Sequence, residues 1–325
     1  MMFEIGMINQ PGVWVTLAVG AVLALLLGAL RSRRESVASG RILAATVLLP
    51  LGVVFFSHLM YCLMDAEYII ESYSFGYLFA FWKQGYMFYG GILGAAVILL
   101  LAGGKQRMKL LECYDVRRCF YGHLALMLAA ARIAEGFAGQ GYGEYWFEEK
   151  MFFCRFPFMT YDGYYEGWAW ALFMAEALVA VILCIVLLAR KKTWDGDGAL
   201  LLLGLYASAQ IVLESLRRDE FLRWGFVRIE EVFSGVAILF VLICYCCKAG
   251  RGKTASKISC FVLFLLMAVL CLLLEFATEG RIPFLLFLEV YQCYLVMAAA
   301  CCVIAGCVLW MRRICNTSNN LEKNV

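Results

Sequence analysis

The residues of this chain that could do chemistry are charged side chains near the ends of long apolar segments. The clearest pair is Arg132 and Glu135, which lies near the end of an apolar run and precedes a glycine-rich segment that leads to Glu144. Residues three apart share one face of a helix, and charge inside a membrane is costly unless it is paired or hydrated. The pair either fixes helix packing or belongs to a binding site, and the nearby charges and glycines favour a site.

Glu214 and Arg217 form a second pair with the same spacing, at the end of another apolar run. The segment 214–231 that begins there carries four arginines and five acidic residues. Arginine suits phosphate because its planar guanidinium presents a fork of hydrogen-bond donors. A phosphate site and a salt-bridged surface helix both account for this segment.

Three weaker features concern glycine, tyrosine and histidine. Gly90 and Gly91 open an apolar run, where free N–H groups at a helix N-terminus attract anions, although glycine pairs also serve helix packing alone. Tyr161 belongs to the segment 157–162, which alone reads as a loop. His58 lies deep in an apolar run, and the sequence leaves open whether it joins helices or takes part in catalysis.

The fifteen cysteines do not indicate a metal site. Most lie inside apolar runs, where cysteine behaves as a small hydrophobic residue, and their spacing is not that of metal ligands. The sequence also has no phosphate-binding loop, metalloprotease helix or nucleophile elbow. We therefore expect no metal, no cofactor and no nucleic-acid partner.

The elements that must position these residues are membrane-spanning helices. Hydrophobic residues make up 64% of the 325 positions and charged residues 16%, against about 45–50% and about 25% in soluble domains. The apolar residues form continuous runs of about 20, the length of a helix that crosses a bilayer, rather than the short alternating segments of barrel strands. The fold class is therefore all-α, a polytopic integral membrane helical bundle. The nine predicted spans are roughly 12–30, 42–64, 87–104, 119–138, 167–189, 198–216, 230–247, 257–276 and 286–311.

Basic residues fall in alternate connecting segments and so predict the orientation. Arginine and lysine gather after the first, third, fifth, seventh and ninth spans, whereas the stretches 65–86 and 139–166 are mainly acidic. Cytoplasmic loops carry an excess of basic residues. We therefore expect the N-terminus outside and the C-terminus in the cytoplasm.

The basic stretch 248–257 divides the chain into two predicted parts. Seven spans with nearly all the intramembrane charge precede it, and two spans whose notable charge is Glu289 follow it. We predict a seven-span transmembrane domain over 1–250, followed by an appended transmembrane hairpin and a short cytoplasmic tail over 251–325.

Four segments, in this order along the chain, resemble motifs of bacterial prolipoprotein diacylglyceryl transferases. Residues 88–91 are similar to the family's His-Gly-Gly entry, and residues 132–144 to its Gly-Arg-x-x-Asn-Phe-x-Asn-Gly-Glu signature with two extra residues. Residues 156–162 are similar to His-Pro-x-x-x-Tyr-Glu, and residues 214–217 to Glu-Phe-Phe-Arg. The resemblance covers about three quarters of the chain and implies seven spans, N-terminus outside, as predicted for 1–250.

The resemblance implies an enzyme of lipoprotein biosynthesis in the bacterial cytoplasmic membrane. Members move the diacylglyceryl group of phosphatidylglycerol to the lipobox cysteine thiol of a preprolipoprotein, which forms a thioether. The expected partners are phosphatidylglycerol, this cysteine and the surrounding membrane lipids.

Such a reaction needs cations that hold phosphate and a base that forms thiolate, because a free cysteine has a pKa of about 8.5. We expect Arg132 and Arg217 to hold the phosphate and to stabilise the leaving glycerol phosphate. Tyr89 stands where the family has its catalytic histidine, and a phenol is a poor base unless a neighbouring arginine favours its anion. A desolvated Glu144, or His58 if it reaches the same cavity, could replace it. The residues expected to bind the phospholipid are Gly90, Gly91, Glu135, Glu214 and Tyr161.

Other positions also depart from the family. Glu135 stands where an asparagine is usual, Glu230-Glu231 replaces Gly-Gln, His58 replaces an arginine, and the tyrosine of the first span has no match near Trp14. These departures, with the missing histidine, favour an alternative, a non-catalytic lipid- or lipoprotein-binding paralogue.

The retained charges favour the transferase over that alternative. Arg132, Glu144, Glu214 and Arg217 are all present, and buried charge is costly to keep without a use. A transporter, a third class, would show broken helices in the two halves of an internal repeat, and we find no such repeat.

Overall fold

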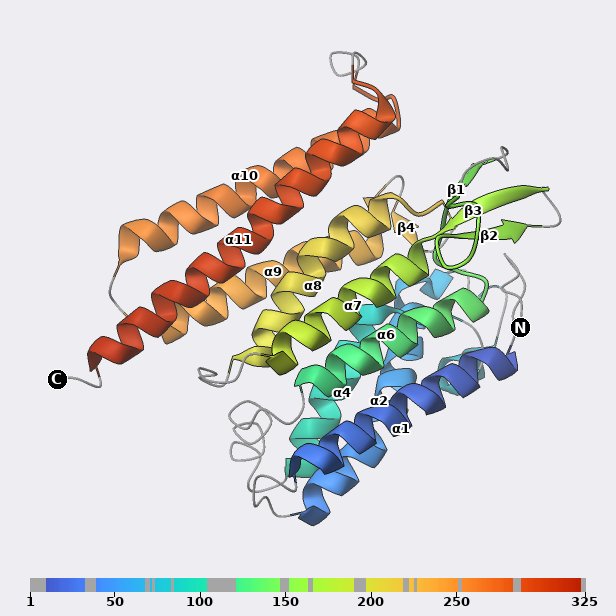
Figure 1. Ribbon diagram of the computed structural model, residues 1–325, viewed down its shortest axis with the longest axis horizontal. Coiled ribbons are helices and arrows are strands. Elements are labelled where there is room, and N and C mark those ends of the chain that lie inside the picture. The colour runs from blue at the N-terminus through green and yellow to red at the C-terminus, as the bar shows by residue number, and fades with distance from the viewer. Residues whose placement is uncertain are drawn as a thin grey trace. The chain divides into compact units, whose positions relative to one another are not determined.

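The computed structural model describes most of the chain as helix (Figure 1). The described residues are 10–32, 39–67, 71, 74–82, 85–103, 121–146, 152–162, 166–189, 197–218, 222–224, 227–250, 253–282 and 288–322. Within these ranges lie nine α-helices: α1 (Gln10–Ser32), α2 (Ser39–Met64), α4 (Phe88–Gly103), α6 (Tyr121–Phe137), α7 (Leu172–Ala189), α8 (Gly198–Ser215), α9 (Ile229–Lys248), α10 (Thr254–Thr278) and α11 (Val290–Glu322).

These helices confirm the predicted fold class, because each predicted span overlaps one of them. Five helices, α2, α8, α9, α10 and α11, are long and apolar enough to cross a membrane, and α1, α4 and α7 carry shorter apolar stretches. Large apolar side chains of α10, such as Val262 and Leu266, are exposed, as expected for a surface that faces lipid. The chain is therefore a polytopic helical membrane protein.

The chain forms two compact units, and each is described by itself. Unit 1 comprises Met1–Gln140 and Cys184–Gly196, and unit 2 comprises Gly141–Leu183 and Asp197–Val325. The predicted boundary near residue 250 stays a prediction.

Small residues set the helix packing in unit 1, where α2 lies against α4 and α1 against α6. A Cβ atom added to Gly94 of α4 would lie 2.3 Å from the carbonyl oxygen of Gly52 in α2. A Cβ atom added to Gly20 of α1 would lie 2.2 Å from the Cβ atom of Ala130 in α6. Glycine therefore permits the close approach that stabilises helix pairs in membranes.

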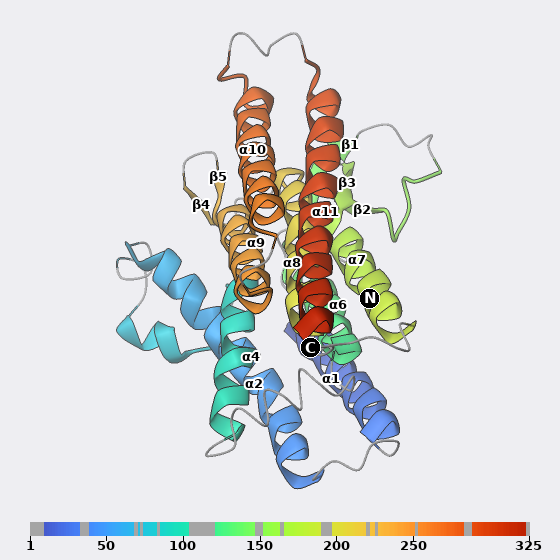
Figure 2. The ribbon, with the colours of Figure 1, turned by 90° about the vertical axis from the view of Figure 1, so that its left-hand side faces the viewer.

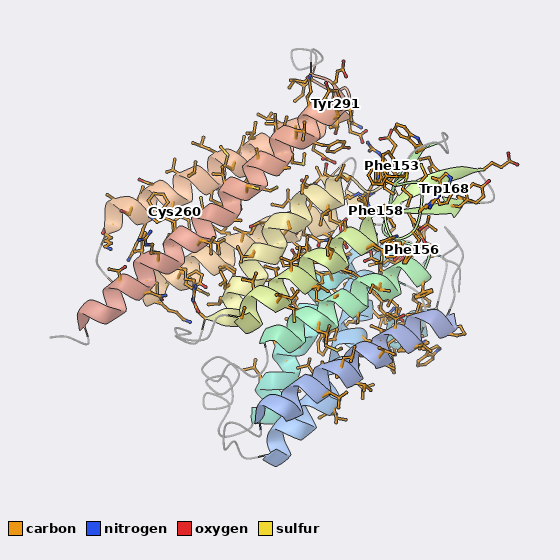
Figure 3. The ribbon with its side chains drawn as sticks, viewed as in Figure 1. Phe153, Phe156, Phe158, Trp168, Cys260 and Tyr291 are labelled. Carbon is orange, nitrogen blue, oxygen red and sulfur yellow. The ribbon has the colours of Figure 1, made fainter. Side chains whose placement is uncertain are left out.

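Two small antiparallel sheets in unit 2 were not predicted. Strands β1 (Tyr142–Trp146), β2 (Met159–Asp162) and β3 (Gly167–Ala171) pair in the order β1-β3-β2, and β4 (Arg223–Trp224) pairs with β5 (Val227–Arg228). The fifth helix consequently begins at Leu172 and not near residue 167, since residues 167–171 are the central strand. Aromatic side chains gather about the larger sheet (Figure 3), where Phe153 stacks on Trp170 with ring centroids 5.3 Å apart.

Helices α8, α9, α10 and α11 of unit 2 pack together, and α10 and α11 form an antiparallel hairpin (Figure 2). Helix α11 contacts both α8 and α9, so the hairpin lies directly against the two last helices of the predicted seven-span domain. The hairpin is therefore an integral part of the helix packing of unit 2.

Candidate functional site

Arg132 lies on α6 in unit 1 with its side chain almost fully buried. Its Nη1 atom donates a hydrogen bond to Oε2 of Glu135 at 2.6 Å, one helical turn later. Its guanidinium also lies over the ring of Phe88, 4.8 Å from the centroid, a distance at which an aromatic face attracts a cation. Two partners thus hold a buried positive charge in a defined orientation.

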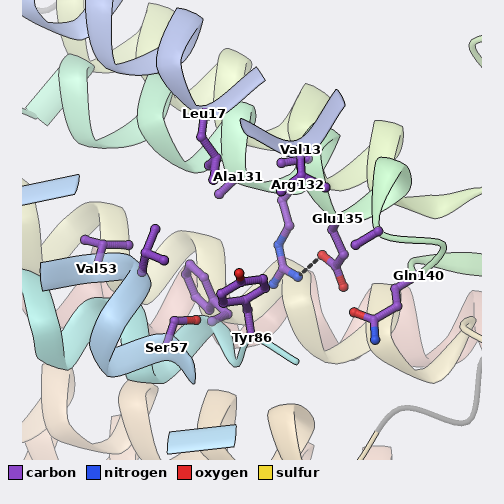
Figure 4. A pocket seen from close by; sticks show the side chains of 13 residues that line it. Val13, Leu17, Val53, Ser57, Tyr86, Ala131, Arg132, Glu135 and Gln140 are labelled. Atoms are coloured by element: carbon purple, nitrogen blue, oxygen red, sulfur yellow. Dashed lines mark hydrogen bonds and ion pairs between the residues drawn. The ribbon is translucent and has the colours of Figure 1, made fainter. Parts of the chain in front are cut away.

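A cavity of about 100 Å³ lies beside this arginine (Figure 4). One water occupies roughly 10–15 Å³ by a comparable measure, so the cavity has room for several waters or for a phosphate-sized group. Most of its lining residues are apolar, and they come from α1, α2, the start of α4 and the end of α6. The polar lining residues are Ser57, Tyr86, Arg132, Glu135 and Gln140.

Tyr86, which sequence reasoning missed, supplies a hydroxyl group near this cavity. Its OH donates to the carbonyl oxygen of Phe81 at 2.9 Å. Burial, with a smaller contribution from Tyr77, raises the pKa of Tyr86 to about 12. Tyr86 therefore remains a neutral phenol at physiological pH. The sequence could have pointed to Tyr86 through its position, two residues before Phe88, with which α4 begins.

Tyr89, Gly90 and Gly91 lie at the start of α4, against α2. Tyr89 is buried and contacts Phe88 edge-to-face, with centroids 4.9 Å apart, and it is not among the residues that line the cavity. A Cβ atom added to Gly90 would lie 2.6 Å from the carbonyl oxygen of Phe56, and the N–H group of Gly91 donates to the carbonyl of Met87 at 3.2 Å. These contacts support helix packing, and a role of the glycines in lipid binding stays a prediction.

His58 is fully buried and contacts backbone carbonyl groups. Its Nδ1 lies 3.1 Å from the oxygen of Gly85, and its Nε2 lies 2.9 Å from the oxygen of Tyr77. Carbonyl oxygens only accept hydrogen bonds, so both contacts are hydrogen bonds only when both ring nitrogens carry a proton. These contacts support a structural role, joining α2 to the 3-10 helix Phe75–Phe79, and catalysis by His58 stays a prediction.

Glu214 and Arg217 lie in unit 2, at the end of α8, within a buried polar network. Arg217 Nη1 lies 3.1 Å from Glu214 Oε1, and Gln210 Nε2 donates to the same oxygen at 2.6 Å. Arg228 Nη2 donates to the carbonyl oxygen of Arg217 at 2.8 Å. Gln210 also lies 3.5 Å from both Glu176 and Glu230. Both predicted ion pairs are therefore present, but the second belongs to a larger cluster.

The cluster holds more acidic than basic side chains. Its buried acids are Glu176, Glu214, Glu230, Glu231 and Glu275, and its buried cations are Arg217 and Arg228. Within the described residues, Glu231 Oε2 has no hydrogen-bond partner. Buried charge is stable only where it is paired and hydrogen-bonded, so this cluster is a costly feature of the fold.

The sequence analysis did not single out the buried charged residues of the last two helices. Glu289, expected to be the notable charge of the last two spans, is exposed. Among the described residues, the buried charges there are Lys257 and Glu275 of α10 and Arg312 of α11, so that expectation was wrong. Glu275 interrupts an otherwise apolar run, which was the signal available.

Glu144 and Tyr161 lie on the three-stranded sheet. Glu144, on β1, is exposed, so the desolvated environment expected for it is absent. Tyr161, on β2, is also exposed, and its ring lies edge-on to Trp168. The segment expected to be a loop forms β2, and its Asp162 accepts a hydrogen bond from the hydroxyl of Tyr145 at 2.7 Å.

A backbone contact connects β1 to the end of α8. The N–H group of Arg218 donates to the carbonyl oxygen of Tyr142 at 2.9 Å. Tyr142 is two residues before Glu144, and Arg218 directly follows Arg217. This contact therefore joins the strand that carries Glu144 to the turn that carries Arg217.

Comparison with known proteins assigns a family to the first three quarters of the chain. The family model for "Prolipoprotein diacylglyceryl transferase" matches residues 2–247. A phosphatidylglycerol–prolipoprotein diacylglyceryl transferase of Clostridium kluyveri is 30% identical over 176 residues, which span 52% of this chain and 66% of the relative. One of Streptococcus equi subsp. zooepidemicus is 24% identical over 261 residues, which span 78% of this chain and 96% of the relative. The family match ends before α10, so the α10–α11 hairpin lies outside it.

Proposed function

Because this chain belongs to the prolipoprotein diacylglyceryl transferase family, we propose that it transfers diacylglyceryl from phosphatidylglycerol to the lipobox cysteine of a preprolipoprotein. It would act in a bacterial cytoplasmic membrane, with its N-terminus outside and its C-terminus in the cytoplasm. The observation that carries the proposal is Arg132, a buried cation held by Glu135 and Phe88 on the wall of a cavity of phosphate size.

In the proposed reaction the cysteine sulfur attacks the glyceryl carbon that bears the phosphate. The carbon–sulfur bond forms while the carbon–oxygen bond breaks, and glycerol phosphate leaves with the electron pair. Arg132 neutralises the phosphate in the bound lipid and the additional charge that develops on it. Glu135, fixed to the guanidinium at 2.6 Å, keeps the arginine pointing toward the cavity.

Arg217 is the second proposed cation. Its buried guanidinium is held by Glu214, and its backbone by Arg228. A cation so constrained is preorganised, which lets it stabilise developing charge without moving. Glu214 therefore acts by positioning Arg217, and Gln210 by positioning Glu214.

Glu144 is the proposed base for the cysteine thiol. Its carboxylate is exposed on β1, where a thiol arriving from the aqueous side of the membrane can reach it. Tyr89 and His58 are both buried, and the ring nitrogens of His58 already contact two carbonyl groups. Base catalysis by a positioned side chain contributes about 100-fold to 10,000-fold.

The second candidate function is a lipid- or lipoprotein-binding protein without catalysis. The observation that favours it is Tyr89, which occupies the histidine position and packs against Phe88 in the buried start of α4. This protein would retain the cavity and the cations and would bind phosphatidylglycerol without cleaving it.

Direct transfer distinguishes the two functions. Purified protein in detergent is incubated with phosphatidylglycerol and a lipobox peptide, and the peptide mass is followed, with Arg132→Ala as control. We expect the parent protein to add a diacylglyceryl group and the variant to lose this activity. Arg132-dependent lipid binding without transfer would contradict the transferase and establish the binding protein.

A further inference from the structure

The cavity beside Arg132 is lined by a negative as well as a positive side chain. Arg132 and Glu135 both line it, and they form an ion pair in which Nη1 lies 2.6 Å from Oε2. The side chain of Glu135 keeps 14% of its surface exposed, against 4% for Arg132. A carboxylate has two oxygen atoms, which together accept several hydrogen bonds. The wall of this cavity therefore presents one cation and one anion to a ligand.

Gln140 extends the polar part of the lining beyond Glu135. In Figure 4 the carboxylate of Glu135 lies between the guanidinium of Arg132 and the amide of Gln140. The backbone N–H group of Gln140 donates to the carbonyl oxygen of Glu135 at 3.2 Å. Within the part of the chain that the structure describes, the side-chain amide of Gln140 makes no hydrogen bond. Its oxygen and the neighbouring carboxylate both accept hydrogen bonds, so an ammonium group, which has three donors, can contact them together.

The ion pair between Asp197 and Arg312 in unit 2 shows how the protein alone completes such a pair. Asp197 also accepts a hydrogen bond from the Tyr245 hydroxyl at 3.1 Å, and all three residues are buried. The Arg132–Glu135 pair differs because it borders a cavity that a ligand can enter. Packing accounts for the first pair, whereas the second pair also faces space that packing leaves open.

The charges of the pair limit which head group the cavity accepts. Arg132 and Glu135 together carry no net charge, and most of the lining residues are apolar. A phosphate that binds Arg132 brings a negative charge close to the carboxylate of Glu135, and like charges at short range repel. Burying a charge without compensation is also costly. A head group with an ammonium group beside its phosphate avoids both penalties, because each of its charges meets an opposite charge.

Glu135 is also a departure from the family, in which an asparagine is usual at this position. An asparagine amide is neutral, so it neither repels a phosphate nor attracts an amine by charge. Phosphatidylglycerol has an uncharged glycerol head group beyond its phosphate. A carboxylate in place of the amide therefore changes the charge that a head group meets in this cavity.

We propose that Glu135 and Gln140 form an amine-binding subsite beside Arg132, and that the cavity accepts phosphatidylethanolamine, a zwitterionic phospholipid, at least as well as phosphatidylglycerol. Arg132 binds the phosphate, while the ammonium group donates to the carboxylate of Glu135 and to the amide oxygen of Gln140. The charged atoms of the head group occupy the cavity of about 100 Å³, and the acyl chains remain in lipid. This inference rests on the proposed phospholipid site, but not on transfer.

Competition between two lipids on one sample tests the proposal in the full-length protein. Purified protein in detergent receives equal amounts of phosphatidylethanolamine and phosphatidylglycerol with identical acyl chains. Native mass spectrometry measures the ratio of the two complexes. Both lipids compete for the same folded molecules, so partial unfolding of a variant leaves this ratio unchanged. Complexes that persist in Arg132→Gln are subtracted, because they form elsewhere on the protein.

Four variants separate the charge of Glu135 from its other effects. Glu135→Gln removes the charge at almost the same size, and Glu135→Asp retains it. Gln140→Leu removes the amide oxygen of the subsite. Glu279→Gln is the matched control, because it removes an exposed carboxylate of unit 2 and so lowers the negative charge of the protein by the same amount.

We expect the parent protein to bind phosphatidylethanolamine at least as tightly as phosphatidylglycerol. In Glu135→Gln the ratio of the first complex to the second should fall about tenfold or more, because a charge-assisted hydrogen bond to the amine is lost. Gln140→Leu should lower the ratio severalfold, Glu135→Asp should keep most of it, and Glu279→Gln should match the parent protein. A parent protein that prefers phosphatidylglycerol, or an unchanged ratio in Glu135→Gln, would overturn the proposal.

Binding and transfer together separate this inference from the proposed function. A parent protein that prefers phosphatidylglycerol and transfers its diacylglyceryl group to the lipobox peptide would overturn the amine-binding subsite and support the transferase. The expected lipid ratio without any transfer to the peptide would support the subsite and contradict the transferase. A parent protein that binds neither lipid would overturn the subsite itself.

Discussion

Arg132 in unit 1 and Arg217 in unit 2 have the same kind of partner, a glutamate three residues away, but different surroundings. Arg132 has one acidic partner and an aromatic ring, and it borders a cavity. Arg217 is fully buried, and its pair is enclosed by further glutamates and by Gln210. The same spacing in the sequence therefore gives a charge that borders a cavity in unit 1 and a charge that other side chains enclose in unit 2.

This difference shows that the two residues that form an ion pair do not determine how exposed the pair is, because other residues enclose it or leave it open. The pair itself is local, because its two members lie three residues apart in the sequence. The enclosure depends on residues that other helices bring, such as Glu230 of α9 and Glu275 of α10. We therefore expect a substitution of Arg217 to cost more stability than the same substitution of Arg132.

The largest effect on stability is expected for Arg217→Gln. This change leaves Glu214 buried without its cation, and removing one member of a buried pair costs about 3–5 kcal/mol. Unfolding in mixed micelles measures the loss. The double variant with Glu214→Gln should recover part of it, because the two side chains interact directly. A loss below about 1 kcal/mol would mean that water reaches this pair.

An intermediate effect is expected for Gly94→Ala in unit 1. The new methyl group would lie 2.3 Å from a backbone oxygen of α2, so the helices must separate, at a cost of about 1–3 kcal/mol. Gly235→Ala in α9 is the control, since among the described residues nothing beyond the neighbouring backbone of its own helix lies within 4 Å of the added Cβ. It should be neutral or stabilising by up to about 1 kcal/mol. Similar losses for both variants would contradict glycine-mediated packing.

A smaller stability effect, with a large effect on binding, is expected for Arg132→Gln. Water can enter the neighbouring cavity and solvate Glu135, so the loss should be about 1–2 kcal/mol. Phosphatidylglycerol binding should fall at least about tenfold, because a charge-assisted contact to phosphate is removed. Arg132→Lys, which keeps the charge, should bind with intermediate affinity. If Arg132→Gln binds phosphatidylglycerol as tightly as the parent protein does, then Arg132 does not hold the lipid phosphate, and this prediction is wrong.

The smallest effect is expected for Tyr86→Phe, and only at high pH. A tyrosine whose pKa is about 12 in the folded protein and about 10 when unfolded contributes stability below pH 10 that is lost as the pH rises toward 12. The melting temperature of the parent protein should therefore fall across this interval more steeply than that of the variant. Parallel curves would indicate that Tyr86 is not shielded from water.

The sequence predicted the helices well because lipid allows few alternatives. A backbone in a bilayer must satisfy its hydrogen bonds within itself, so an apolar run of about 20 residues reads as a helix. Strands β1, β2, β4 and β5 were missed because they are short and lie outside such runs. The run over residues 167–171 carries Trp168 and Trp170 in alternation, a strand pattern, but it continues into α7 and was read as part of it.

The candidate site was predictable only where its contacts are local. The pairs Arg132–Glu135 and Glu214–Arg217 each lie on one turn of chain and were predicted. The partners Glu176, Glu231 and Glu275 come from three other helices, and their meeting depends on how each helix is rotated. Gln210, one turn before Glu214 on α8, is a local contact that the sequence analysis missed. The rotation of each helix about its axis cannot be predicted from a single sequence.

The ion pair between Asp197 and Arg312 has a consequence for biosynthesis. The two residues are separated by 115 positions, and a chain is made from its N-terminus onward. Asp197 therefore enters the forming protein long before its arginine exists, with Tyr245 as its earlier hydrogen-bond partner. A nascent chain that stops near residue 250 lacks both Arg312 and Glu275, so the packing around α8 becomes complete only when the last helix has been synthesised.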